Sequence, residues 1–167
     1  VAADLRGDKL GLAVNLNNLG YAFAAQGFPH EALRQYEESL AVSREIGDRK
    51  GIAQTLNNLA QVQTALGDYS QAERWANEAL EIFRELGLPL EIAGALSSLA
   101  VITARRASYD QSMIYGVEAL GIRRRLQHRP QATEHGPADH AAHRGVPRRD
   151  RPAEGRREHP AHGPADR

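Results

Sequence analysis

The stretch Leu-Asn-Asn-Leu at residues 16–19 returns twice along the chain, as Leu-Asn-Asn-Leu at residues 56–59 and as Leu-Ser-Ser-Leu at residues 96–99. Both intervals are 40 residues long, and the register holds without an insertion or a deletion. A repeat of this length is a supersecondary unit that is too small to bury its own apolar face, so the units must stack. The chain is therefore predicted to be an array with an extended surface, which favours binding over catalysis.

Apolar residues within one unit follow the period of an α-helix. In the second unit, Ile52, Leu56 and Leu59 fall on one helix face, and Ala76 and Leu80 fall on the face of a second helix. Each unit is thus predicted to be a hairpin of two antiparallel helices, and the fold class is all-α. We expect helices over about 10–26, 29–46, 50–66, 69–86, 89–106 and 109–126, in units of about 8–47, 48–87 and 88–126.

A glycine follows each of the first four predicted helices, at the position where a residue in the left-handed conformation commonly ends a helix. These residues are Gly27, Gly47, Gly67 and Gly87. Gly7 stands 40 residues before Gly47, so residues 1–6 are predicted to be the last turns of a preceding second helix.

Small residues recur where the two helices of a hairpin should touch. Gly20, Ala60 and Ala100 in the first helices are expected to face Ala32, Ala72 and Ser112 in the second helices. A large side chain there would splay the hairpin, because overpacking typically costs about 1–3 kcal/mol.

Gly-Asp-Tyr at residues 67–69, followed by small residues at Ala72 and Ala79, resembles the tetratricopeptide repeat. The 40-residue spacing and the Leu-Asn-Asn-Leu-Ala of residues 56–60 are similar to the longer variety of kinesin light chains and of bacterial signalling and transcription regulators. The resemblance covers residues 1–126. It implies a right-handed superhelical solenoid that acts as a non-catalytic scaffold for a protein or peptide in its concave groove.

The third unit departs from this pattern. Ala107 stands where the turn glycine is expected, and Gly94, Gly116 and Gly121 lie inside predicted helices. Each of these glycines costs about 1 kcal/mol relative to Ala in a helix interior, so the third unit is predicted to fray first.

The resemblance implies that first helices line the concave face. Projection of the helices turns two sets of side chains towards it: Val14, Asn17, Tyr21 and Ala24, and one unit later Gln54, Asn57, Gln61 and Thr64. An Asn amide offers one acceptor and two donors, which suit the backbone of an extended peptide of any sequence. Family members use such an Asn ladder in this way, and the role transfers either to Asn17 and Asn57 or to Asn18 and Asn58.

The alternative is that these Asn residues bridge adjacent units and contact no ligand. Asn is a poor helix former, so a pair in the middle of each helix needs one of the two explanations. Arg105 and Arg106 present a second open choice. They either select acidic ligands at the end of the groove or are solvated cations at a helix C-terminus.

Composition removes several classes of function. The chain contains 21 Lys and Arg, 21 Asp and Glu and no Cys, so its neutral charge favours neither nucleic acid nor membrane as a partner. Residues 1–126 have a single histidine, His30, and no glycine-rich phosphate loop. No catalytic residue, metal site or cofactor is expected, and a cytoplasmic location is the default.

Residues 127–167 form a segment of different composition. They contain six of the eight Pro and six of the seven His, and Val146 is their only large aliphatic residue. Such a segment cannot bury a core, so we predict a disordered Arg/Pro/His/Ala/Gly-rich tail. Two origins stay open: a genuine basic linker, or an out-of-frame reading of a GC-rich gene.

The repeat stops without a polar capping helix. The last hairpin is therefore predicted to expose an apolar face, and the chain is predicted to self-associate through its open array ends. An alternative to the free scaffold is the sensor arm of a larger bacterial NTPase or transcriptional regulator.

Overall fold

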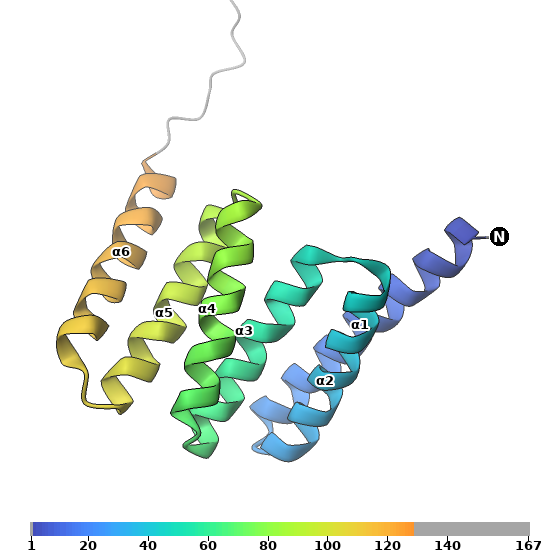
Figure 1. Cartoon of the computed structure of the whole chain (residues 1–167), viewed down its shortest axis with the longest axis horizontal. Helices are drawn as coiled ribbons and strands as arrows, with labels where there is room; N and C mark the ends of the chain where they lie inside the picture. Colours follow the sequence, from blue (N-terminus) through green and yellow to red (C-terminus); the bar gives the residue numbers. More distant parts are fainter. Residues whose placement is uncertain (1, 129–167) are drawn as a thin grey trace, which may run out of the picture. The chain divides into compact units, whose positions relative to one another are not determined.

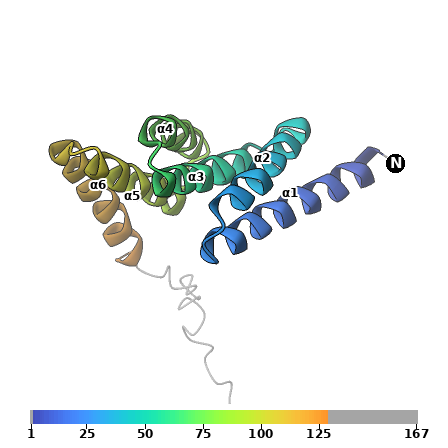
Figure 2. The same cartoon turned by 90° about the horizontal axis from the view of Figure 1, so that it is seen from below.

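The computed structural model describes residues 2–128, which form six helices and no strand (Figure 1). Successive helices pair as three hairpins in chain order, and α1 and α6 lie at opposite ends of the row in Figures 1 and 2. The predicted all-α solenoid of hairpins is thereby confirmed. The helices are α1 (Ala2–Ala25), α2 (Pro29–Ile46), α3 (Arg49–Leu66), α4 (Tyr69–Glu85), α5 (Pro89–Arg105) and α6 (Tyr109–Gln127).

Left-handed residues end the helices as the glycine pattern predicts. Gly27, Gly47, Gly67 and Gly87 have φ values of 82°, 69°, 90° and 64°. Ala107 takes the same conformation with φ 60°, although its Cβ makes the left-handed region unfavourable. The turn geometry is thus kept in the third unit at a cost in backbone strain.

The start of the array differs from the prediction. α1 is one helix of 24 residues that runs through Gly7, so residues 2–6 do not end a separate preceding helix. A stretch this short is below the length at which a helix is stable by itself, and continuing α1 adds hydrogen bonds without a new nucleation step. That prediction was therefore wrong.

The core lies between the hairpins. Leu56, Leu59, Leu96 and Leu99 are completely buried. A Cβ added to Gly20 would lie 2.7 Å from the ring of Tyr36, so the close approach in the first hairpin involves this aromatic side chain. In the third hairpin the Ser112 hydroxyl donates a hydrogen bond of 2.8 Å to the Ala100 carbonyl. Small residues thus bring the paired helices together.

Ala119 is the one buried residue of α6, so this helix contributes little to the core, whereas α5 of the same hairpin contributes Leu96, Leu99 and Ile102 within residues 2–128. Every helix in that range is too short or too polar to cross a bilayer. The predicted tail, residues 127–167, lies outside the described part of the chain except for Gln127, which ends α6, and His128.

Candidate functional site

Two adjoining pockets open along α1, α3 and α5. Their volumes are about 340 and 450 Å³, and both are lined by Asn57 and Gly94. We call the two pockets together the first-helix groove. Its other lining residues are Asn17, Asn18, Tyr21, Gln54, Asn58, Phe83 and Glu91 in the first pocket, and Gln61, Thr64, Ser97, Ser98, Val101 and Arg123 in the second.

The first-helix groove contains all eight site residues that the sequence predicts. These are Asn17, Asn18, Tyr21, Gln54, Asn57, Asn58, Gln61 and Thr64. Val14 and Ala24, which the helix projection also turned towards this face, line neither pocket. Most of the lining therefore follows from helix period and repeat length.

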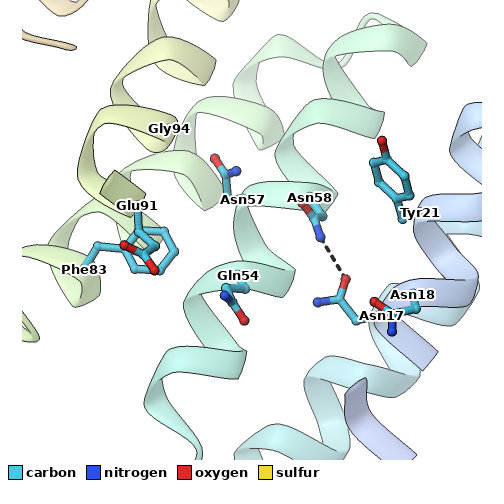
Figure 3. A pocket seen from close by; sticks show the side chains of 9 residues that line it. All are labelled: Asn17, Asn18, Tyr21, Gln54, Asn57, Asn58, Phe83, Glu91 and Gly94. Atoms are coloured by element: carbon cyan, nitrogen blue, oxygen red, sulfur yellow. Dashed lines mark hydrogen bonds between the residues drawn. The ribbon is translucent and has the colours of Figure 1, made fainter. Parts of the chain in front are cut away.

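Figure 3 shows how three helices share the first pocket. Gln54, Asn57 and Asn58 lie along α3 in the middle, with the α1 residues on one side and Glu91 and Gly94 of α5 on the other. Tyr21 is 69% exposed, so its ring is free to pack against a ligand.

One Asn pair bridges two units. Asn58 Nδ2 donates a hydrogen bond of 2.8 Å to Asn17 Oδ1, and the dashed line in Figure 3 marks it. The bond joins one member of each of the two Asn pairs to which the family role transfers. Asn17 and Asn58 thus form a bridge between repeats, as the alternative interpretation of the Asn residues predicts.

Asn57 has no such partner. Its Oδ1 atom is buried and accepts no hydrogen bond from any group within residues 2–128. A buried carbonyl oxygen without a donor costs about 1–3 kcal/mol, and native proteins contain few of them. Since Asn57 borders both pockets, its amide is placed where a ligand could reach it after rotation of the side chain.

Hydroxyl groups in the groove are bonded to their own helices. Thr64 donates to the Ala60 carbonyl at 2.7 Å, and Ser97 donates to the Ala93 carbonyl at 2.8 Å. Ser98 contacts the carbonyl of Gly94 at 3.4 Å. These hydroxyls keep lone pairs for a ligand donor but have no free proton to give.

Charge is confined to two groove residues. Glu91 lines the first pocket and lies 3.5 Å from the Lys50 ammonium, whereas Arg123 lines the second pocket. Arg106 pairs with Glu73 on the preceding hairpin, so the cation of the groove is Arg123 and not Arg105 or Arg106. The middle of the groove is polar and uncharged.

Several lining residues were absent from the prediction. Gly94, Ser98 and Val101 stand 40 residues after Gln54, Asn58 and Gln61, so the repeat itself could have found them. Glu91 lies on α5 one turn before Gly94, so helix period could have found it as well. Phe83 and Arg123 belong to the second helices α4 and α6, and only the packing of neighbouring helices brings them to the pockets.

The sequence of residues 11–85 matches the family described as tetratricopeptide repeat. Residues 11–85 are tetratricopeptide repeats. The crystal structure of the TPR domain of Arabidopsis FLU has the same fold, with a TM-score of 0.64 and 15% identity over 73% of this chain and 98% of that one. No curated protein sequence matches the chain.

A second solved structure, BtubC (BKLC) from P. vanneervenii, is 28% identical with a TM-score of 0.65. The similarity covers 72% of this chain but only 48% of BtubC, so the chain spans about half of that protein. Tetratricopeptide repeats are in general non-catalytic scaffolds for protein interaction. The third hairpin, which lies beyond the matched residues, continues the same architecture.

Proposed function

We propose that the first-helix groove binds an extended peptide segment of a partner protein, with Asn57 and Asn18 as contacts to the peptide backbone. The observation that carries the proposal is the Asn57 amide, whose buried Oδ1 has no donor within residues 2–128 and which borders both pockets. Asn58, the next residue along α3, differs from Asn57 because its amide donates a hydrogen bond to Asn17 of the preceding repeat.

Asn amides suit a backbone because each offers an acceptor and two donors, which match the carbonyl and N–H groups of any peptide. Asn18 is exposed and lines the first pocket, and the Gln54 and Gln61 amides extend the polar surface along α3. Tyr21 adds an exposed ring for an apolar side chain. This combination favours backbone capture over recognition of one particular sequence.

The test is a display selection in which the full chain is the bait and a random peptide library is the probe. Peptides enriched on the wild type should lose at least about tenfold in affinity for the Asn18→Ala/Asn57→Ala variant, since each lost hydrogen bond is worth about 1 kcal/mol. Asn77→Ala is the matched control, because Asn77 lies in α4 and lines neither pocket.

Unfolding midpoints of both variants separate a binding defect from a folding defect. We expect the Asn18→Ala/Asn57→Ala variant to be at least as stable as the wild type, because Ala is the better helix former. If no peptide is enriched, or if enriched peptides bind this variant as tightly as the wild type, the groove is not a backbone-binding site.

The alternative role as a sensor arm of a larger bacterial regulator remains a prediction from the sequence, as does a cytoplasmic location. The two roles are compatible, since a sensor arm also needs a binding surface.

A further inference from the structure

α6 leaves open a face that α2 and α4 bury. Leu120 stands 40 residues after Leu80 and 80 after Leu40, yet it is 65% exposed where they are 4% and 7% exposed. α2 and α4 are each followed by a first helix, α3 or α5, that packs on them, and α6 has no such helix after it within residues 2–128. The exposed side of α6 is therefore shaped to receive a first helix.

α1 shows the opposite deficiency. Leu19 is 45% exposed, whereas its equivalents Leu59 and Leu99 are completely buried. Since α1 already packs on α2 within its own hairpin, the missing cover is a second helix on its other side. In the part of the chain that the structure describes, α1 thus lacks a second helix on that side, and α6 is a second helix whose outer face lacks a first helix.

Ion pairs between consecutive second helices define a register. Arg44 of α2 lies 3.6 Å from Glu78 of α4, and Arg84 of α4 lies 2.9 Å from Glu118 of α6. The two arginines are 40 residues apart, and each reaches a glutamate 34 residues further on. The same arginine–glutamate pair therefore recurs from one repeat to the next, and we call this series the ion-pair ladder.

Arg124 is the next arginine of the ion-pair ladder, 40 residues after Arg84. Glu38 is the residue equivalent to Glu78 and Glu118 in the first unit. If the first unit of a second copy follows the third unit of the first copy, Glu38 of the second copy therefore takes the place of the glutamate that would pair with Arg124. Arg124 and Glu38 are both exposed, and neither has an ion pair within residues 2–128. The two side chains therefore have opposite charges and stand at the positions that the 40-residue repeat assigns to an ion pair between two copies.

We propose that the protein self-associates head to tail, with α6 of one copy packed against α1 of the next. Leu120 then becomes buried against the α1 face that carries Leu19, and Arg124 pairs with Glu38 of the second copy. Such an interface joins two different surfaces and leaves one of each unused at the ends, so assembly continues beyond the dimer unless a ring closes.

Sedimentation of the full chain over a wide concentration range tests the apolar contact. The mean mass should rise past that of a dimer, and Leu120→Asp should weaken association by about tenfold or more, because an apolar side chain is replaced by a charge in the contact. Leu90→Asp is the matched control, since Leu90 is 64% exposed but belongs to neither α1 nor α6.

Charge reversal tests the register. Arg124→Glu and Glu38→Arg should each weaken association by about fivefold at low salt, because each sets like charges opposite one another in an exposed contact. An equimolar mixture of the two variants should associate like the wild type, since every mixed junction joins Arg to Glu.

Three outcomes would overturn the proposal. A strict monomer at all concentrations would mean that α6 is covered by another segment or does not pack on α1. A mass that stops at a dimer, with no further growth, would indicate a symmetric contact between identical faces. A mixture that associates no better than either variant alone would show that Arg124 and Glu38 do not meet.

Discussion

Asn58 Nδ2 donates a hydrogen bond of 2.8 Å to Asn17 Oδ1 and so joins α3 to α1 across the boundary between two repeats. Asn57, the next residue along α3, borders both pockets of the first-helix groove and has a buried Oδ1 without a donor in residues 2–128. Two chemically identical neighbours therefore have different surroundings. One contributes to the cohesion of the array, and the other is the centre of the proposed binding surface.

Stability should distinguish these two residues. Asn58→Ala removes the bridge and leaves Asn17 Oδ1 unpaired, whereas Asn57→Ala removes a buried oxygen that already lacks a donor within residues 2–128. We therefore expect Asn58→Ala to be less stable than Asn57→Ala by about 2 kcal/mol or more. Both substitutions place Ala in the middle of α3, so their gains in helix propensity cancel in the comparison. Urea unfolding of the two variants measures the difference, and equal midpoints would show that the bridge adds nothing.

The contact between Gly20 and Tyr36 should be sensitive to a single methyl group. In Gly20→Ala the new Cβ would lie 2.7 Å from the Tyr36 ring, and we expect a loss of about 1–3 kcal/mol from overpacking. Gly11→Ala in the same helix is the control, because a Cβ there meets no atom within 4 Å. That variant should be more stable than the wild type by up to about 1 kcal/mol, as thermal melting would reveal.

The left-handed Ala107 offers a stabilising substitution. Ala107→Gly relieves the steric conflict at φ 60° and should raise the free energy of unfolding by about 0.5–1 kcal/mol, after allowance for the greater freedom of Gly in the unfolded chain. The reverse change, Gly67→Ala at φ 90°, should destabilise the second hairpin by a similar amount. Chemical denaturation of both variants checks the opposite signs.

Alkaline pH should weaken the first hairpin through Tyr36. Burial, with a smaller contribution from the nearby Tyr21, raises the pKa of Tyr36 from 10.0 to about 12. The unfolded chain loses this proton at lower pH than the folded one, so this contribution to stability is complete below pH 10 and declines as the pH rises towards 12.

Unfolding measured between neutral pH and pH 12 tests the linkage, with tyrosinate absorbance to follow the titration. Tyr36→Phe is the control, because Phe retains the ring against Gly20 and has no proton to lose. If the wild type and Tyr36→Phe lose stability in parallel over this range, Tyr36 does not couple folding to pH.

The sequence alone determined the local structure of this array. Helix bounds from α2 to α6 agree with the apolar period and the glycine positions to within about one residue, because each hairpin is specified by contacts close in the chain. The same period, carried forward by 40 residues, marked Asn17, Gln54 and Gln61 as residues of one face. A periodic pattern is enough for these features, since all units repeat the same geometry.

Tertiary structure decided what depends on the fit between hairpins. It selected Asn58 and not Asn57 for the bridge to Asn17, and it brought Phe83 and Arg123 to the groove. It also left Leu19 and Leu120 exposed at opposite ends although their equivalents are buried. The rotation and spacing of one hairpin against the next set these contacts, and they arise from close packing of side chains far apart in sequence, which the hydrophobic period does not encode.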